Sequence, residues 1–267
     1  MNKKIGFIGS GHMAEAIIGG IVQSGFARPE DVLASNRTMP KLMDVRENYG
    51  IQIAENNIDV AHSCEIVFLS VTPDKYPTVI DEIKDAIRED AIIILIAAGE
   101  GLAENEERFE RKLKVVKAMP NTPVLIGEGM TSISFNEFVT EQEKEEVQAL
   151  FESFGKVECI DEKLMDTASA VAGSSPAFIY MYIEALADAA VLYGMPRETA
   201  YTLAAQTVYG ASKMVLETGT HPAQLKDEVC SPGGSTIQSV ARLEESGFRS
   251  AIINAVKANV EKLSKND

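Results

Sequence analysis

Short apolar runs alternate with longer amphipathic segments along the chain up to Asp161. A continuous apolar run predicts a buried parallel strand, and an amphipathic segment predicts a helix that covers the sheet. Their alternation is typical of an α/β fold with a mostly parallel sheet. The runs that predict strands cover residues 5–8, 32–34, 51–53, 66–71, 91–98, 115–118, 130–135 and 157–160, and the main helical segments are 11–23, 76–87, 104–114 and 141–154.

The hydrophobic pattern changes after Asp161, where strand signals stop and long helical periods begin. We therefore expect two domains, residues 1–161 and residues 162–267, of which the second is all-helical. The segment 175–193 is apolar on nearly every side, which is typical of a buried helix, and a second long helix is predicted over 197–217. Because a small domain cannot bury two such helices alone, the pattern predicts a homodimer formed through the C-terminal half.

A glycine-rich turn directly follows the first predicted strand and opens the first predicted helix. Glycine at position 9 tolerates a turn conformation that a side chain resists, and glycine at position 11 lets the backbone approach a phosphate closely. Ala14 is small enough for the helix and the strand to touch. The helix N-terminus then presents free N–H groups to a dinucleotide pyrophosphate, although an ordinary strand–helix turn with spare glycines is the alternative. The predicted cofactor contacts in this turn are Gly9, Ser10, Gly11, His12 and Met13.

The residues after the second strand indicate which dinucleotide is bound. Ser35, Asn36 and Arg37 stand about twenty residues beyond the glycine turn, where an NAD enzyme usually has a carboxylate for the ribose 2′-hydroxyl. A carboxylate would repel a 2′-phosphate, whereas Arg37 can pair with it. The triplet therefore favours NADPH, with NADH as the second choice. The alternative interpretation is that Ser35 caps the next helix and Arg37 is simply solvated.

The other predicted cofactor contacts lie where further strands end, because ligands of open α/β sheets bind at that edge. Small residues after the fifth strand would let a flat nicotinamide–ribose pass close to the backbone. These contacts are Asn57, Ser70, Val71, Thr72, Pro73, Ala97, Ala98 and Gly99.

Two further loops are candidates for the substrate. The loop 119–123 has two prolines around Asn-Thr, which makes it a stiff wall for a hydride-transfer pocket or a plain turn. The segment 231–237 is a second glycine-rich turn that opens a helix, and its free N–H groups suit a small carboxylate; a well-capped helix without a ligand is the alternative. The predicted substrate contacts are Asn121, Ser231, Gly233, Gly234, Ser235 and Thr236.

Composition narrows the classes of function. The 267 residues include 40 acidic and 25 basic side chains, and the net charge of −15 argues against binding a nucleic-acid backbone. Cys64, Cys159 and Cys230 form neither a disulfide framework nor a zinc pattern, so we expect reduced thiols in a cytoplasmic protein and no metal. No secretory signal pattern is found, and no apolar run looks long enough to span a bilayer. The three histidines are scattered, and we expect none to be catalytic.

The motifs together resemble the 1-pyrroline-5-carboxylate reductase family over essentially the whole chain. The resemblance implies an N-terminal Rossmann domain and a C-terminal helical domain for dimerisation and substrate binding. It also implies a substrate site between the two domains that the partner subunit completes, and dimers that assemble into larger rings, commonly decamers. One departure is Thr72, which stands where the family usually has a lysine. The segments that carry the resemblance are 6–14, 35–37, 119–123, 173–178 and 227–237.

The reaction that the resemblance implies is hydride transfer from NAD(P)H to the C=N carbon of a cyclic imine, which gives L-proline in the last step of its biosynthesis. The amides of Gly234 and Ser235 would bind the substrate carboxylate, and the Thr236 hydroxyl would hydrogen-bond the ring nitrogen as the catalytic contact. A β-hydroxyacid dehydrogenase is one alternative, but its catalytic lysine has no counterpart in 175–193. A non-catalytic NADPH-binding sensor is the other.

Overall fold

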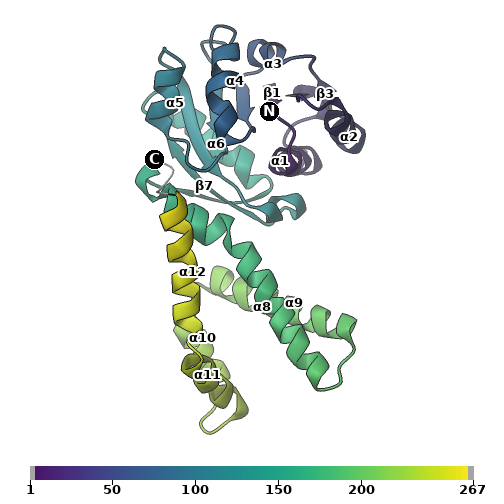
Figure 1. Cartoon of the computed structure of the whole chain (residues 1–267), viewed down its shortest axis with the longest axis vertical. Helices are drawn as coiled ribbons and strands as arrows, with labels where there is room; N and C mark the ends of the chain where they lie inside the picture. The colour runs from purple at the N-terminus through teal and green to yellow at the C-terminus, as the bar shows by residue number, and fades with distance from the viewer. Residues whose placement is uncertain (1–3, 264–267) are drawn as a thin grey trace. The chain divides into compact units, whose positions relative to one another are not determined.

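The computed structural model of the chain describes residues 4–263, which pack as two compact units (Figure 1). The first unit runs to Ser174 and takes in the chain again from Val260, and the second unit is Ser175–Asn259. The last strand ends at Cys159, but the helical turns that follow it still pack on the sheet of the first unit. The first unit therefore continues past Asp161, and the division into functional domains at that residue stays a prediction.

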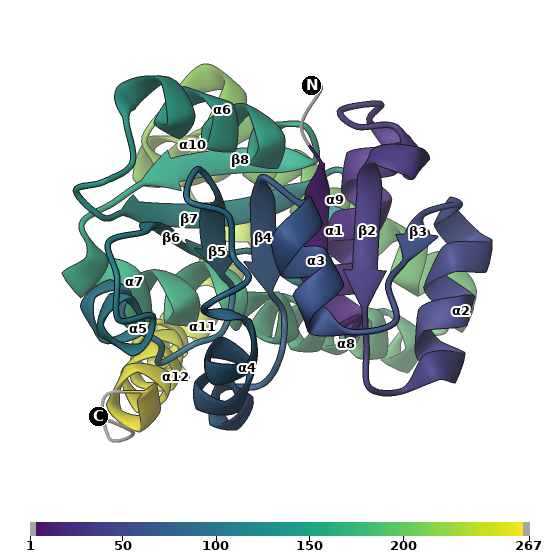
Figure 2. The same ribbon diagram turned by 90° about the horizontal axis from the view of Figure 1, so that it is seen from above.

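The first unit is built on one eight-stranded sheet with the order β3-β2-β1-β4-β5-β6-β7-β8 (Figure 2). The pairs from β3 to β6 are parallel, β7 runs antiparallel to β6, and β8 is parallel to β7. The order of the six parallel strands is that of a Rossmann sheet, which reverses direction between β1 and β4. The strands are β1 (Ile5–Ile8), β2 (Val32–Ser35), β3 (Gln52–Ile53), β4 (Ile66–Leu69), β5 (Ile92–Leu95), β6 (Lys114–Met119), β7 (Gly129–Phe135) and β8 (Gly155–Cys159).

Helices cover both faces of this sheet, with one hydrophobic core on each face (Figure 2). α1, α2 and α6 contribute buried side chains to one core, and α3, α4 and α5 to the other. In the first core Phe7 and Phe68, on neighbouring strands, stack with their ring centroids 4.5 Å apart. The helices are α1 (His12–Gln23), α2 (Met39–Tyr49), α3 (Asn57–Ser63), α4 (Tyr76–Ile83), α5 (Leu102–Arg108), α6 (Glu141–Glu152) and α7 (Met165–Ala168).

The neighbouring strands β4 and β5 end earlier than the hydrophobic pattern predicts, and both stop at the same edge of the sheet. Pairing ends at Leu69 in β4 and at Leu95 in β5, although both apolar runs extend further. Beyond these residues the chain leaves the sheet at the edge where open α/β sheets bind ligands. The predicted helix over 104–114 also ends early, at Arg108, because Glu110 takes a left-handed φ of 57° that a helix cannot contain.

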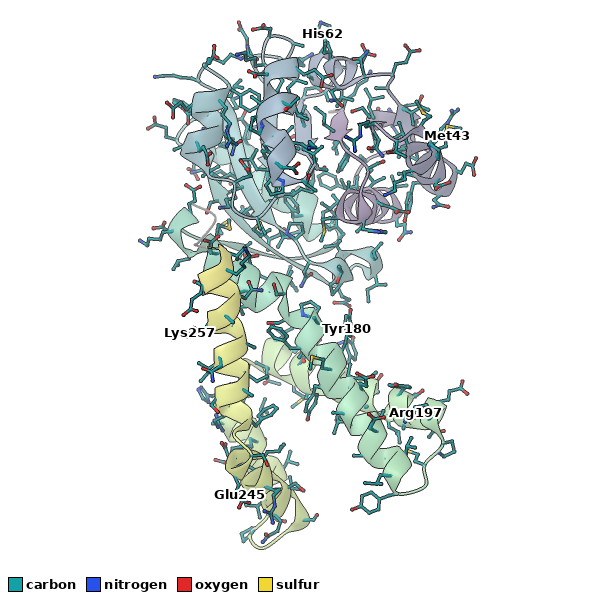
Figure 3. The ribbon with its side chains drawn as sticks, viewed as in Figure 1. Met43, His62, Tyr180, Arg197, Glu245 and Lys257 are labelled. Atoms are coloured by element: carbon teal, nitrogen blue, oxygen red, sulfur yellow. The ribbon has the colours of Figure 1, made fainter. Side chains whose placement is uncertain are left out.

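The second unit is entirely helical, and its large apolar side chains lie mostly on its surface (Figure 3). α8 packs along α9, where Arg197 pairs with Asp188. Tyr180 and Tyr193 are 60% and 90% exposed. So much exposed apolar surface is typical of a protein–protein interface. The helices are α8 (Ser175–Leu192), α9 (Arg197–Thr218), α10 (Pro222–Val229), α11 (Ser235–Glu245) and α12 (Phe248–Leu263), whose last turn belongs to the first unit.

The expectation that no segment is long enough to span a bilayer is wrong by length and composition. The helical run Glu162–Leu192 has 31 residues and is apolar enough to pass that test, and only 6% of its most apolar window is buried. The expectation failed because it looked for an unbroken apolar run, whereas this run mixes apolar residues with small ones. The same length and composition fit a helix that a second subunit covers.

Candidate active site

The glycine turn after β1 is held between the ends of β2 and β4. The Gly9 amide donates to the Ser35 carbonyl oxygen at 2.9 Å. Gly9 itself has a φ of +100°, and a Cβ there would lie 2.6 Å from the Ser70 carbonyl oxygen. Only glycine fits this position, because both its conformation and its clearance exclude a side chain.

The turn delivers the chain into α1 with its first N–H groups uncapped. Gly11 is the N-cap residue, and no side chain accepts a hydrogen bond there. A Cβ added to Gly11 would meet nothing within 4 Å, so the space in front of the helix is open. An open helix N-terminus next to a tight glycine turn is the arrangement that binds a pyrophosphate.

A cavity of about 640 Å³ opens at this edge of the sheet. It brings together most of the residues that the sequence predicted as cofactor contacts: Gly9, Ser10, Gly11, Ser35, Asn36, Arg37, Asn57, Ser70, Val71 and Thr72. It is also lined by side chains that the sequence analysis did not single out, which are Ile8, Thr38, Lys41, Glu55, Asn56, Lys75, Thr78, Val79 and Glu82.

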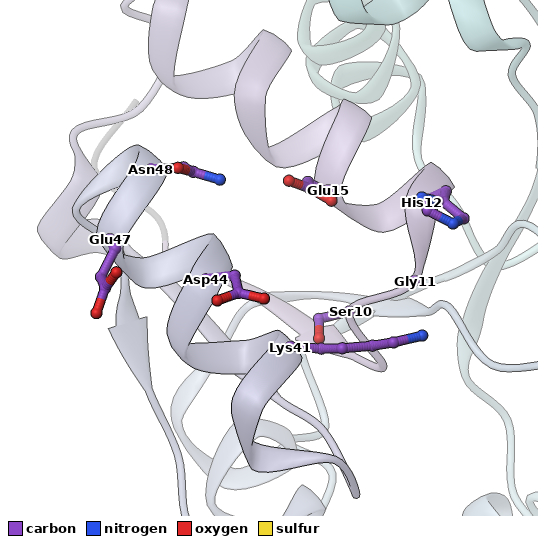
Figure 4. A pocket seen from close by; sticks show the side chains of 8 residues that line it. All are labelled: Ser10, Gly11, His12, Glu15, Lys41, Asp44, Glu47 and Asn48. Atoms are coloured by element: carbon purple, nitrogen blue, oxygen red, sulfur yellow. The ribbon is translucent and has the colours of Figure 1, made fainter.

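A second cavity, of about 420 Å³, lies between the start of α1 and α2 (Figure 4). It shares three residues with the first: Ser10, Gly11 and Lys41. His12, predicted as a cofactor contact, lines this second cavity only. In Figure 4 these four residues lie toward one end of the cavity, and Glu47 and Asn48 lie toward the other.

Two buried hydroxyls at the glycine turn lack partners. The Oγ atoms of Ser10 and Ser70 are buried without a hydrogen bond within residues 4–263. Buried polar groups in native proteins are nearly always hydrogen-bonded. Two buried hydroxyls without a hydrogen-bond partner at one cavity therefore point to a polar ligand. Together with the cradle at Gly9 and Gly11, these hydroxyls fit the phosphates and ribose of a dinucleotide.

Two cations on the first cavity are unpaired within the described part of the chain. Arg37 follows β2, and Lys41 stands in the first turn of α2; both side chains are exposed. Sequence reasoning missed Lys41, although a basic residue early in the helix that follows Arg37 could have signalled it. Ser35 does not cap that helix, as the alternative had it, because its N-cap residue is Thr38.

The position that departs from the family pattern is occupied by a local hydrogen-bond cluster. The Thr72 hydroxyl donates to Asp74, and the Lys75 ammonium pairs with the same carboxylate at 2.5 Å. Hydrogen bonds from Lys75 and then Thr72 lower the pKa of Asp74. Lys75 lines the cavity, three residues after Thr72, the position where the family usually has a lysine.

The remaining predicted cofactor contacts line neither cavity. Met13 packs against the first core, and Pro73 begins the 3₁₀ turn Pro73–Lys75. The segment 97–99 follows β5 at the same edge of the sheet, and the buried side chain of Tyr76 holds its first residue. The Tyr76 hydroxyl donates to the Leu69 carbonyl oxygen at 2.8 Å and accepts from the Ala97 amide at 3.3 Å. Burial raises the pKa of this tyrosine.

The side chain of Asn121 ties the loop 119–123 to two other segments of the chain. The Asn121 Nδ2 donates to the Ala172 carbonyl oxygen at 3.0 Å, and its Oδ1 accepts from the Met130 amide at 2.9 Å. The side chain is 7% exposed. It therefore positions the loop on its neighbours, and direct contact with a substrate stays a prediction.

The second glycine-rich turn, in the helical unit, also ends in an uncapped helix. Gly233 has a φ of +72°, and the Gly234 amide donates to the Ser231 carbonyl oxygen at 3.0 Å. Gly234 is the N-cap residue of α11, and no side chain caps it. The Thr236 side chain is half-buried and has no hydrogen-bond partner within residues 4–263. The turn can accept a small anion, with one hydroxyl beside it.

Two family models match this chain, one in its N-terminal part and one in its C-terminal part. Residues 162–266 match the family model described as pyrroline-5-carboxylate reductase dimerisation, and residues 4–99 match NADP oxidoreductase coenzyme F420-dependent. The chain is 45% identical over 265 residues to the pyrroline-5-carboxylate reductase of Escherichia coli (strain K12), covering 99% of this chain and 98% of that protein. The chain belongs to the pyrroline-5-carboxylate reductase family. A plant member of the family, from Arabidopsis thaliana, is 39% identical over 96% of this chain and 92% of its own length.

Solved structures of the family have the same fold. The pyrroline carboxylate reductase of Plasmodium falciparum, solved with NADP bound, matches with a TM-score of 0.89 at 34% identity and covers 98% of this chain and 97% of its own. The enzyme from Coxiella burnetii matches at 0.91, with 33% identity and coverage of 99% and 98%. Prephenate dehydrogenase from A. aeolicus, at 14% identity and 0.54, shares the fold alone.

Proposed function

We propose that this enzyme reduces 1-pyrroline-5-carboxylate to L-proline with NADPH as the hydride donor. The observation that carries the proposal is the full-length match at 45% identity to a pyrroline-5-carboxylate reductase, supported by an NADP-bound relative with the same fold. A β-hydroxyacid dehydrogenase is disfavoured, because α8 has no lysine to act as its catalytic base.

The cofactor residues follow from the first cavity. The glycine turn and the start of α1 hold the pyrophosphate, and the buried hydroxyls of Ser10 and Ser70 gain partners when it binds. Arg37 and Lys41 are free to pair with the 2′-phosphate, and the absence of a carboxylate at Ser35 removes the usual repulsion. NADH lacks that phosphate and is the weaker donor.

The substrate residues follow from the turn before α11. The amides of Gly234 and Ser235 bind the carboxylate, and the Thr236 hydroxyl bonds the ring nitrogen. When bound, the reduced nicotinamide supplies the hydride to the C=N carbon, and a proton ends on the ring nitrogen. Because a threonine hydroxyl is a weak acid at neutral pH, Thr236 orients the ring more than it donates a proton.

The subunits pair through the second unit. Its exposed apolar helices and the dimerisation model over 162–266 support a homodimer whose partner completes the substrate site. Assembly of dimers into larger rings, commonly decamers, is part of the proposal. We place the enzyme in the cytoplasm, since Cys64, Cys159 and Cys230 are all free thiols, as is usual for proteins of that reducing compartment.

The decisive experiment is to follow oxidation of NADPH and of NADH by the purified enzyme with the five-membered cyclic imine acid, and to identify the product. Proline formation with a lower KM for NADPH is expected. Binding of NADPH without any turnover would instead support the sensor alternative.

A further inference from the structure

Three side chains that line the first cavity form a hydrogen-bonded relay from three separate elements. The Ser35 Oγ, at the end of β2, donates to the Oδ1 of Asn57 at 2.8 Å. Asn57 is the first residue of α3, and its Nδ2 donates to the Oε2 of Glu82, on α4, at 2.8 Å. Ser35 is 1% exposed, whereas Glu82 is exposed.

The chemistry of Glu82 sets the direction of every bond in this relay. An ionised carboxylate can only accept hydrogen bonds, so the Asn57 atom that faces it must be the amide nitrogen. The other amide atom is then the carbonyl oxygen, which also only accepts. The Ser35 hydroxyl must therefore donate its only hydrogen bond to Asn57. Toward the cavity, Ser35 has only lone pairs to offer.

We propose that Glu82 is a positioning residue that makes Ser35 an acceptor for the 3′-hydroxyl of the adenosine ribose, which NADPH and NADH share. This inference rests on the proposed use of NADPH. An acceptor-only oxygen suits a ribose O–H and repels a phosphate oxygen, which carries no proton to give. The 2′-phosphate therefore belongs to Arg37 and Lys41, which line the same cavity and are unpaired within residues 4–263. In this proposal Ser35 binds the ribose, and Arg37 and Lys41 bind the 2′-phosphate.

The test compares Glu82→Ala, Glu82→Gln and Glu55→Gln by the dissociation constants of NADPH and NADH, measured from nicotinamide fluorescence. Glu82→Ala frees the Asn57 amide to turn over, so both constants should rise about fivefold to tenfold, as for one lost hydrogen bond. Glu82→Gln keeps an acceptor oxygen and should stay within about twofold of wild type. Glu55 lines the same cavity outside the relay, and its neutralisation should also stay within about twofold.

The ratio of the two constants separates this proposal from simple charge repulsion. The relay acts on a ribose hydroxyl, so Glu82→Ala should weaken both dinucleotides by the same factor. Tighter NADPH binding in Glu82→Ala, unchanged constants, or a Glu82→Gln as weak as Glu82→Ala would each overturn the proposal. If the wild-type enzyme binds both dinucleotides but does not reduce the imine acid, the proposed function fails while these binding results still decide the role of Glu82.

Discussion

Gly9 lies so close to Ser70 that a single added methyl group would come within 2.6 Å of the Ser70 carbonyl oxygen. The contact joins the first turn of the chain to the end of β4, some sixty residues later in the sequence. Gly11, two residues on, has a φ of −76° and open space in front of it. Position 9 therefore needs glycine for its backbone conformation and close packing, whereas position 11 needs it only to keep the space in front of the helix open.

Gly9→Ala should reduce the stability of the fold, whereas Gly11→Ala should not. Alanine at position 9 must adopt a φ of +100° and also displace backbone, which we expect to cost about 2–3 kcal/mol. Alanine at position 11 should leave the free energy of unfolding within about 0.5 kcal/mol of wild type. Urea denaturation measures both. Equal stability of the two variants would contradict the close packing at Gly9.

Gly11→Ala should instead weaken dinucleotide binding, because its methyl group takes up space in the proposed pyrophosphate site. We expect the dissociation constants of NADPH and NADH to rise about tenfold, measured by fluorescence titration of a variant that folds normally. Tight binding by this variant would place the pyrophosphate away from the start of α1.

Arg37→Ala and Lys41→Ala should each raise the KM for NADPH about tenfold and change the KM for NADH less than about twofold. Each removes one unpaired cation from the cavity, and only NADPH has the phosphate that this cation would meet. Steady-state kinetics with both donors measure the effect. Lys112→Ala is the control, since it removes the same charge from an exposed site outside both cavities. Equal losses with the two donors would count against the phosphate site.

Thr236→Ala should lower kcat by about tenfold to a hundredfold, which corresponds to about 1.4–3 kcal/mol of transition-state stabilisation. The interaction removed would be the proposed hydrogen bond between the hydroxyl and the ring nitrogen of the imine. Thr236→Ser keeps the hydroxyl and should retain most of the rate, so it separates the role of the oxygen from packing. An unchanged kcat in Thr236→Ala would remove this residue from the mechanism.

The pair between Lys114 of β6 and Glu143 of α6 should make stability depend on pH. The two side chains approach to 2.5 Å and are 24% and 16% exposed. Although burial alone would raise the pKa of Glu143, hydrogen bonds from Lys114 and from Thr140 outweigh it and lower this pKa below its ordinary value of 4.5. The ionised form is therefore the one that the folded protein favours, and its contribution is lost as the pH falls through the lowered pKa.

Glu143→Gln should accordingly cost about 1 kcal/mol of unfolding free energy at pH 7, and the difference from wild type should close below about pH 4.5. Chemical denaturation across the pH range measures this difference. Glu141→Gln is the matched control in the same helical turn, where the carboxylate is 86% exposed and its loss should matter little. A Glu143→Gln effect that does not change with pH would assign the stabilisation to packing.

The features that depend on neighbours along the chain could be predicted from the sequence. The hydrophobic period gives most strands and helices, and the glycine turn after the first strand predicts an uncapped helix N-terminus, because backbone conformation and helix ends are local properties. The departures lie at the ends of elements, which the hydrophobic pattern does not mark. Pairing stops at Leu69 and Leu95 although the apolar runs go on, and α5 ends where Glu110 turns the chain.

The side chains that share a cavity are brought together by packing between segments that are distant in the sequence. Asn57 and Glu82 are 25 residues apart, and no spacing rule joins them, yet they meet because α3 and α4 pack side by side on one face of the sheet. Lys41 reaches the same cavity from α2. The direction of the Ser35 hydrogen bond is set by the carboxylate of Glu82 on α4, through Asn57 on α3. The sequence could therefore predict that the serine lies at the site, but not that its hydroxyl acts as an acceptor.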